Sequence, residues 1–434
     1  MRRLASIGLI VVGLLAPAKT SAENWPQWRG PQGNSHSRET KLAVRWSADS
    51  DSVTKIKLPE WGTSTPAIWD NAVFLTSEAD GKLVLVRIDP QASKIVWSKS
   101  VGEGIAKRKG EGKGNRTSKF HNLHNLASPS PITDGGRVVV HFGNGLLASY
   151  RFDGSLEWER NLVDDYGEYT IWWGHANSPV FHEDLVISVC MQDPLDGVDG
   201  AGSVPNYVVA HDKRTGKLVW KTARETGAHA EEGDSYTTPV FHTTPDGPQM
   251  IVMGGNVLDS YDPSTGKKLW SLPGLVGGRT ITGPTLHDGV VYTTIGMRGP
   301  LHAIEIPEHP GQLSESSIQW KIAPSTPDTC CPVVANGLVF IVTDNGIASC
   351  LDAKTGEQYW RERIPGGNYK ASPIVADGNV YFLSLEGHGT VIKADKEFTI
   401  VAKNKLDDEF AASPAVADGT LYLRGKQFLY LIRP

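Results

Sequence analysis

The chain has 434 residues, with 43 Lys and Arg, 48 Asp and Glu and a formal net charge of -5. This weakly acidic balance provides no overall positive field that would attract a nucleic acid or an anionic membrane. We therefore expect no nucleic-acid partner and no electrostatic binding to a membrane surface.

The first 22 residues have the pattern of a secretory signal peptide. Two arginines at positions 2 and 3 precede a mostly apolar stretch over 4–15, and small residues at 20–22 offer a cleavage site. No later segment is apolar over a length that could cross a bilayer. We therefore expect a signal peptide over 1–22 and a soluble, exported mature chain, located in the periplasm or outside the cell.

A strand-like stretch over 53–58 is followed by a repeated unit. Each unit begins with a small residue and a proline, followed by a polar turn and an apolar strand. Short apolar runs alternate in period two and are separated by Asp-Gly, Asn-Gly or Thr-Gly pairs, which favours hairpins. A regular period of this kind indicates a repeat architecture. The anchor prolines recur 41 to 65 residues apart, at Pro66, Pro131, Pro179, Pro239, Pro284, Pro332, Pro373 and Pro414.

Eight such units predict an all-β chain, an eight-bladed β-propeller with four-stranded antiparallel blades. The last unit, from Pro414 onward, has room for only three strands. We expect residues 53–58 to supply its outer strand beside 428–432, which hides two sheet edges and closes a single domain over 23–434. The alternative is a seven-bladed ring with a loose terminal strand.

A second phrase, Asp-x-x-x-Gly-x-x-x-Trp, runs from Asp212, Asp262 and Asp352. A large ring at one place in each blade can wedge between neighbouring sheets and bury about 150–250 Å², and the turn Gly permits a positive φ. We therefore interpret these rings as core. The seventh unit departs from the pattern, since eight residues after Asp395 the chain has Lys403. Six units end in such a residue: Trp97, Trp158, Trp220, Trp270, Trp320 and Trp360.

Four cysteines are few for a disulfide framework. Cys330 and Cys331 begin the first strand of the sixth unit, and Cys350 lies in its third strand. Two strand spacings of about 4.8 Å each exceed the roughly 7 Å across which Cα atoms can be bridged, so Cys350 should remain unpaired. For the adjacent pair, a strained ring and two free thiols both stay open.

The loops that lead into the inner strands should gather at one mouth of the central channel, where many blades converge. Polar residues there also have a structural interpretation, because they fill exposed loops and cap strand ends. No catalytic residue is identified. The candidates for binding a cofactor or another ligand at this mouth are Trp172, Trp173, His175, Asn177, Arg279 and Lys370.

One insertion spaces three carboxylates, Asp193, Asp196 and Asp199, along a loop. Oxygen-rich loops of this kind can hold calcium. The spacing is not that of an EF-hand, so a polar turn is the alternative interpretation of this weak metal candidate.

The phrase from Ala210 to Trp220 resembles the tryptophan docking motif of quinoprotein propellers, the pyrroloquinoline quinone (PQQ)-like repeat family. The opening Asn24-Trp-Pro-Gln-Trp-Arg-Gly-Pro31 is similar to the start of secreted members from planctomycete-type bacteria. The resemblance extends from Trp25 to Pro434, nearly the whole mature chain. It is specific for the fold, whereas the same propeller hosts both dehydrogenases and inert scaffolds.

The resemblance implies two functions. Family dehydrogenases hold PQQ against a Trp floor, with calcium bound by acidic and Asn side chains and an Asp base nearby. No ordered Glu, Asn and Asp set of this chain matches those positions. We therefore expect a monomeric, non-enzymatic binding or scaffold module of the periplasm or cell envelope, which binds another envelope protein or a small ligand at the channel mouth. The alternative is a PQQ- and calcium-dependent dehydrogenase of alcohols or sugars.

Overall fold

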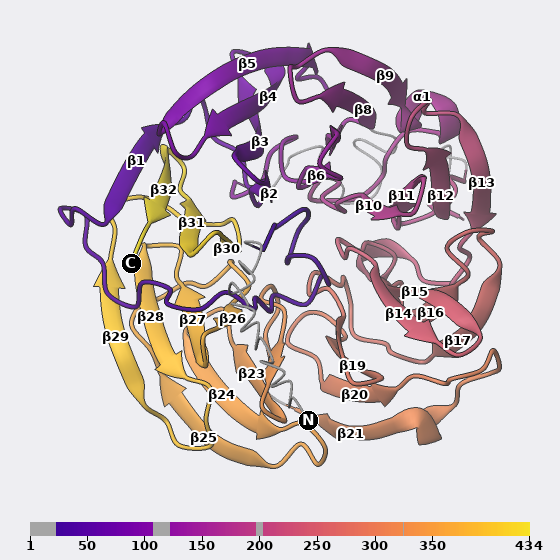
Figure 1. Cartoon of the computed structure of the whole chain (residues 1–434). Coiled ribbons are helices and arrows are strands. Elements are labelled where there is room, and N and C mark those ends of the chain that lie inside the picture. Colours follow the sequence, from indigo (N-terminus) through magenta and orange to yellow (C-terminus); the bar gives the residue numbers. More distant parts are fainter. Residues whose placement is uncertain (1–22, 107–121, 197–202, 324) are drawn as a thin grey trace, which may run out of the picture.

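The computed structural model describes residues 23–106, 122–196, 203–323 and 325–434, so the expected signal peptide lies outside the described residues. Within them the strands form eight four-stranded antiparallel sheets, arranged as blades around a central axis (Figure 1). In blades 1 to 7 the chain runs from the innermost to the outermost strand, whereas in blade 8 the N-terminal strand is outermost. The eight-bladed prediction is confirmed, and the seven-bladed alternative is wrong.

Blades 1 to 4 are built in chain order from the following strands: β2 (Ala67–Trp69), β3 (Ala72–Ala79), β4 (Lys82–Asp89), β5 (Lys94–Glu103); β6 (Ile132–Thr133), β7 (Arg137–His141), β8 (Leu146–Arg151), β9 (Leu156–Asn161); β10 (Val180–His182), β11 (Leu185–Cys190), β12 (Tyr207–Asp212), β13 (Leu218–Ala223); β14 (Val240–Thr244), β15 (Gly247–Gly254), β16 (Val257–Tyr261), β17 (Lys268–Pro273).

Blades 5 to 8 follow in the same way: β18 (Thr285–His287), β19 (Val290–Thr294), β20 (Leu301–Glu305), β21 (Ile318–Ile322); β22 (Val333–Ala335), β23 (Leu338–Val342), β24 (Ile347–Asp352), β25 (Gln358–Arg363); β26 (Ile374–Ala376), β27 (Asn379–Leu383), β28 (His388–Lys393), β29 (Ile400–Lys405); β30 (Ala415–Ala417), β31 (Thr420–Arg424), β32 (Phe428–Ile432) and β1 (Val53–Lys57). The described helices are one α-helical turn, α1 (Leu162–Tyr166), and short 3-10 turns at Ala230–Glu232 and Glu315–Ser317.

The ring closes through β1, which joins blade 8 as its outermost strand. It pairs antiparallel with β32, from Val53 opposite Ile432 to Lys57 opposite Phe428. One buried apolar cluster continues from blade 7 through blade 8 and β1 into blade 1. The expected closure by 53–58 is therefore confirmed.

Arg424 of β31 crosses the same closing seam. Its side chain is fully buried and donates to Thr76 O, to Ser77 Oγ and to Ser64, all in or before the strands of blade 1. Burial away from water lowers the pKa of this guanidinium to about 9, so it remains protonated at neutral pH. Carbonyl and hydroxyl oxygens thus take the place of a counter-ion.

The repeated Asp-x-x-x-Gly-x-x-x-Trp phrase acts across blades. Asp212 caps its turn by accepting the N–H groups of Arg214 and Thr215 at 3.1 and 2.8 Å, and Gly216 follows at φ +66°. The ring of Trp158, from the preceding blade, lies on this glycine, because an added Cβ would approach its Cε3 to 2.6 Å. The indole N–H of Trp158 donates to Lys213 O at 2.9 Å.

The same docking recurs around the wheel. Trp220 and Trp320 lie on Gly266 and Gly356 of the following blades. Five of the six outer-strand indoles donate to a backbone oxygen of the next blade, and Trp270 bonds Gln249 of its own blade instead. These rings are buried or half-buried. The prediction that they are core residues is confirmed.

In blade 7, which lacks an outer-strand Trp, an indole from an earlier part of the chain packs on the sheet. Pairing with β28 places Ala402, not Lys403, at the position of the outer-strand Trp, opposite Val391. The buried ring of Trp46 packs in the same apolar cluster, and its Cζ2 would lie 2.4 Å from a Cβ on Gly389. Asn404 holds the Trp46 backbone N–H at 2.8 Å.

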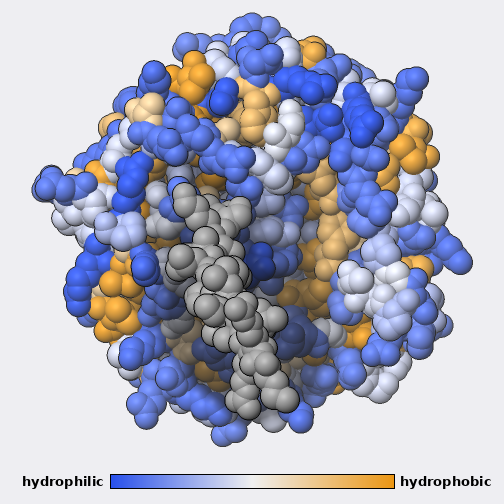
Figure 2. Space-filling model, viewed as in Figure 1, coloured by the Kyte–Doolittle hydropathy of each residue, from blue (hydrophilic) through white to orange (hydrophobic). Residues whose placement is uncertain are grey.

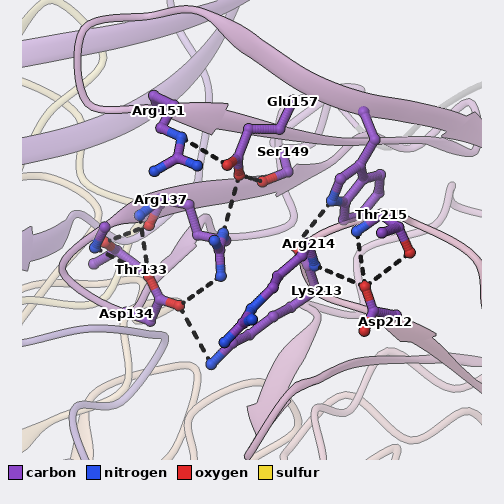
Figure 3. A network of polar contacts seen from close by, with 12 residues as sticks. Thr133, Asp134, Arg137, Ser149, Arg151, Glu157, Asp212, Lys213, Arg214 and Thr215 are labelled. Carbon is purple, nitrogen blue, oxygen red and sulfur yellow. Dashed lines mark hydrogen bonds and ion pairs between the residues drawn. The ribbon is translucent and has the colours of Figure 1, made fainter.

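A polar network spans the seam between blades 2 and 3 (Figure 3). Glu157 pairs with Arg137 at 3.0 Å and with Arg151 at 2.7 Å. Arg137 also contacts Asp134 at 3.1 Å, and Lys213 of blade 3 reaches the same carboxylate at 3.5 Å. The turn that receives the Trp158 indole is therefore also tied to blade 2 by charge.

The face of the wheel seen in Figure 1 is mostly hydrophilic where it is visible, with hydrophobic residues in separate patches (Figure 2). In the described part of the chain, no helix combines the length and the apolar character needed to span a membrane.

The docking of indole on glycine predicts coupled stability effects. We expect Trp320→Ala to lower the free energy of unfolding by about 3–5 kcal/mol, since it empties a buried seam. Gly356→Ala should cost more than the ~1 kcal/mol typical of a strained left-handed position, because the new Cβ would lie 2.7 Å from Cδ2 of Trp320. Urea unfolding monitored by circular dichroism measures both.

The matched control is Gly378, which has φ +70° but nothing within 4 Å of an added Cβ. Gly378→Ala should therefore carry only the backbone cost. In a Trp320→Ala background, Gly356→Ala should fall to the cost of the control. If the two glycine variants are equally destabilised in the wild-type chain, the indole contact does not set the cost.

Candidate functional site

The residues just before the anchor prolines form a ring around the central channel. The backbone N–H of Thr65 donates to Ser130 Oγ at 2.9 Å, and the N–H of Ser130 to Ser178 Oγ at 2.9 Å. The N–H of Ser178 donates in turn to Thr238 Oγ1 at 3.2 Å. In these blades a backbone N–H of one blade is thus hydrogen-bonded to one hydroxyl of the following blade at the hub.

The ring is interrupted once and then resumes. Gly283 has no side chain to accept from blade 4, and it donates its own N–H to Cys331 Sγ at 3.1 Å. The N–H groups of Cys331 and Ser372 donate to the hydroxyls of Ser372 and Ser413, each at 3.0 Å. Thr65 Oγ1 closes the ring by donating to Ser413 O at 3.2 Å.

Residues 25–37, here named the hub strap, cross the channel (Figure 1). Trp25 bridges Ile68 of blade 1, and Ser37 donates its N–H to Val375 O of blade 7 at 2.9 Å. Where the ring is interrupted, a Cβ on Gly283 would lie 3.0 Å from the ring of Trp28. The glycine therefore makes room for this indole.

Arg29 fixes the middle of the strap. Its guanidinium is fully buried and donates to Pro284 O and Pro332 O, both at 3.0 Å, and to Thr285 Oγ1 at 2.5 Å. Burial lowers its pKa from the ordinary value. Because these acceptors belong to blades 5 and 6, Arg29 holds Trp28 beside the channel.

A cavity of about 360 Å³ occupies the channel mouth, and all eight blades and the strap contribute to its wall. A volume in this range is typical of small-molecule sites. Its wall combines hydroxyls, aromatic rings and a few charged groups. Its aromatic and charged lining includes Trp28, Trp173, Tyr236, Arg279, Asp328 and Lys370, and the hydroxyls of the ring also line it.

Both cations at this mouth already have carboxylate partners. Arg279 bonds Asp328 at 2.9 Å and Glu231 at 3.4 Å. Lys370 Nζ lies 2.6 Å from Asp344 Oδ2, and Asp344 also accepts the backbone N–H of Asp328 at 3.0 Å. The pocket therefore presents directed N–H groups with their charge largely compensated.

A groove leads from the pocket to the rim across the seam between blades 8 and 1. A small cleft shares Thr63 and Ala411 with the pocket, and it shares Trp61 with a rim cavity of about 580 Å³. Lys426 lies 5.7 Å from the Trp61 ring centroid and 3.3 Å from Glu409. An aromatic, charged groove thus lies beside the mouth and is joined to it by a cleft of only about 20 Å³.

The structure divides the six candidates from the sequence. Trp173, Arg279 and Lys370 line the pocket. Trp172 is half-buried, and its ring centroid lies 6.1 Å from that of Trp173. Its backbone N–H donates to Asp234 Oδ2 at 2.8 Å. His175 is 1% exposed and stacks on Tyr169 at 4.7 Å, outside the pocket lining.

The sixth candidate, Asn177, is also 1% exposed, and its amide donates to Thr237 O at 2.7 Å. His175 and Asn177 therefore pack between blades, as the structural interpretation of such residues predicts. Whether the others bind a ligand stays a prediction.

The calcium candidate is not assembled by the described residues. Asp193 is buried and accepts the N–H of Leu195 at 3.0 Å, whereas Asp196 is exposed. Asp199 lies outside the described residues. In the part of the chain that the structure describes, no group of three His, Cys, Asp or Glu is arranged to hold a metal ion.

All four cysteines are buried free thiols. Of the two alternatives for Cys330 and Cys331, the structure has the free pair. Cys330 donates to Ala371 O at 3.3 Å, and Cys331 belongs to the hub ring. Cys350 is unpaired, as expected.

PQQ carries three carboxylates, and its family site adds calcium. The described residues do not fit this pair. Arg279 and Lys370 are already paired with carboxylates of the chain, and among the described residues no group of three or more His, Cys, Asp or Glu is placed to hold a metal ion. We therefore derive no chemical step through PQQ.

Trp28 and the hub hydroxyls are site residues that the sequence candidates do not include. The hydroxyls belong to the repeated small residue before each anchor proline, so their shared position was a signal. Trp28 stands outside every repeat, in an opening rich in aromatic residues. A strap through the hub gives that composition a structural reason.

Buried imidazoles at the seam of blades 2 and 3 predict acid sensitivity. Burial lowers the pKa of His141 to about 3, and burial beside His141 lowers the pKa of His175. The unfolded chain binds these protons near pH 6.5 and the folded chain does not, so stability is present above that pH and is lost on acidification. His141→Gln should reduce the loss between pH 7 and pH 5 by about 2 kcal/mol.

Urea unfolding at a series of pH values measures this difference. His309 gives a control of opposite sign, because its bond to Asp246 raises its pKa. His309→Gln should therefore make the acid loss larger. An unchanged pH dependence in His141→Gln would show that this imidazole does not cause the sensitivity.

Comparison with known proteins supports a common fold. A curated relative, the outer membrane protein assembly factor BamB of Yersinia pestis, is 26% identical over 168 residues, which cover 36% of this chain and 39% of the relative. The chain thus matches well under half of that relative's length. BamB from Moraxella catarrhalis has a TM-score of 0.58 at 12% identity, over 88% of this chain and 98% of that chain.

Two quinoprotein structures are similar in the same way. Quinohemoprotein alcohol dehydrogenase from Comamonas testosteroni has a TM-score of 0.67 at 12% identity, over 94% of this chain and 80% of that chain. A europium-containing methanol dehydrogenase has a TM-score of 0.63 at 11% identity, over 92% and 89%. At such identities the likeness shows the fold alone, a PQQ-like propeller.

The PQQ-like repeat family described as outer membrane protein assembly factor BamB matches residues 36–192, 205–305 and 312–399. These ranges include strands of all eight blades. The chain therefore belongs to this family of PQQ-like β-propellers.

Proposed function

We propose that the protein is an exported, non-enzymatic binding module that acts as a scaffold in the periplasm or cell envelope. Its mouth, formed by the hub pocket and the groove across blades 8 and 1, binds a small ligand or part of another envelope protein. The observation that carries the proposal is the charge compensation of Arg279 and Lys370 by Asp328 and Asp344.

Compensated charges favour recognition over redox catalysis. A cofactor anion would have to displace a carboxylate from each cation, which costs the pairs that fix these side chains. Directed donors on a rigid ring, with aromatic rings between them, are what selective binding requires. Membership of a family described by an assembly factor agrees with this function.

The second candidate is a PQQ- and calcium-dependent dehydrogenase of alcohols or sugars. It is favoured by the likeness in fold to the two quinoprotein dehydrogenases. The two functions differ in what the purified protein retains and reduces.

Incubation with PQQ and calcium, followed by gel filtration, tests the dehydrogenase. We expect no quinone absorbance in the protein fraction and no dye reduction with alcohols or sugars. Retained quinone together with substrate-dependent dye reduction would overturn the binding proposal.

A photo-reactive residue in the cell tests the binding surface. Placed at Trp173, in the mouth, it should form a discrete adduct with one envelope component. Placed at Leu218, which is 49% exposed on the outer strand β13, it should not. Equal labelling at both positions would contradict a binding surface at the mouth.

A further inference from the structure

We propose that the hub pocket is a saccharide site, which takes one neutral sugar ring against Trp28. This inference rests on the proposed binding function and names its ligand class. Three observations support it. The hub hydroxyls keep a free donor site, aromatic rings stand in the pocket wall, and the two cations of the pocket are paired with carboxylates.

Five hydroxyls of the hub ring point to a ligand that both donates and accepts hydrogen bonds. Each accepts one backbone N–H of a neighbouring blade, and none donates to an acceptor among the described residues. A hydroxyl has one donor and two acceptor sites, so each of the five keeps one donor and one acceptor. The five are more than nine-tenths buried and line the pocket: Ser130, Ser178, Thr238, Ser372 and Ser413.

Sugar hydroxyls have the same dual character, whereas an inorganic anion only accepts. Buried polar groups in proteins are almost always hydrogen-bonded. A polyol can therefore satisfy the donors and the acceptors of this circle together.

The aromatic rings suit the apolar face of a pyranose. Trp28 reaches the pocket from the strap, and Trp173 and Tyr236 stand in its wall. The backbone N–H of Trp173 donates to Tyr236 Oη at 3.3 Å, which ties these two residues together. An aromatic ring with a polar handle can stack on C–H groups while hydroxyls are bonded at the edge.

The charges favour a neutral ligand. The guanidinium of Arg279 and the ammonium of Lys370 lie 2.9 and 2.6 Å from their carboxylate partners. Each pair can still offer directed donors and acceptors to hydroxyl groups. A carboxylate-bearing ligand would meet Asp328 in the same wall, which disfavours it by repulsion.

The strap and the groove set the size of the ligand. Trp28 and Arg29 close the channel side of a 360 Å³ cavity, so one sugar ring can enter. The cleft between this pocket and the rim cavity past Trp61 measures only about 20 Å³, which sets the limit at one ring.

Calorimetric titration of the full mature chain with D-glucose, D-galactose and N-acetyl-D-glucosamine, and with their disaccharides, tests the proposal. D-Glucuronate is the anionic comparison. We expect at least one neutral sugar to bind at millimolar concentration or below, and more tightly than glucuronate.

The hub variants are chosen so that the fold is retained. Cys331 shows that a thiol at this position still accepts a backbone N–H, so Ser130→Cys and Ser372→Cys keep the acceptor and weaken the donor. The double variant should weaken sugar binding about tenfold or more. Trp28→Ala should weaken it by a similar factor. Ser188→Cys is the matched control, because Ser188 is a buried hydroxyl outside the pocket.

Loss of binding in the hub variants, with unchanged binding in Ser188→Cys and unchanged thermal unfolding, supports the site. The inference fails if no neutral sugar binds, if the hub variants bind as the wild type does, or if glucuronate binds best. Adduct formation at Trp173 without sugar binding would overturn only the saccharide. PQQ-dependent dye reduction with a sugar would overturn the proposed function itself.

Discussion

The docking of an outer-strand indole on the turn glycine of the next blade is the contact on which the wheel depends. A single sheet has two edges and two faces, and it cannot bury both faces by itself. The indole of Trp158 covers Gly216 and bonds Lys213 O, so one side chain joins two sheets by packing and by a hydrogen bond. The turn that receives it is shaped by Asp212 and by the positive φ of the glycine. Blade 7 has no such residue, and there the buried ring of Trp46, from a distant part of the chain, packs against Gly389 of its sheet.

Fixing the blades at the rim brings their inner ends together at the hub. At the hub, hydrogen bonds join neighbouring blades, as indoles do at the outer strands. Each backbone N–H there needs an acceptor because the channel wall is buried. In six of the eight blades the side chain before the anchor proline supplies that acceptor for its neighbour, as Ser130 does for Thr65. A hydroxyl that accepts in this way keeps its proton. The hydrogen bonds that join the blades at the hub therefore leave a circle of hydroxyl donors in the pocket wall.

Periodicity made the fold predictable, and the site was predictable only in part. The spacing of the prolines and the strand at 53–58 were sufficient to predict eight blades and their closure. The prolines recur once in each blade, and the strand at 53–58 belongs to no repeat unit. The same reasoning located the mouth, and three of six candidates line it. It could not separate Trp173 from His175, two residues away, since side-chain direction in a loop depends on the neighbouring blade. It also missed Trp28, because the strap obtains its position from tertiary contacts of Arg29 with blades 5 and 6.

Similar propellers can serve as enzymes or as binding proteins because the ring and the mouth are separable. The indoles, turn glycines and hub acceptors stabilise the propeller whether or not a ligand occupies the central channel. In this chain the charged groups above the hub are paired. A cation left without a carboxylate partner attracts an anionic cofactor, whereas Arg279 and Lys370 are held by Asp328 and Asp344. The ion pairs fix the positions of these two side chains and reduce their electrostatic field. In the proposed site, ligand selectivity therefore depends on the hydroxyls and the aromatic rings. In this chain the strap adds Trp28 to that surface, and the residue that closes the channel also becomes part of what a ligand meets.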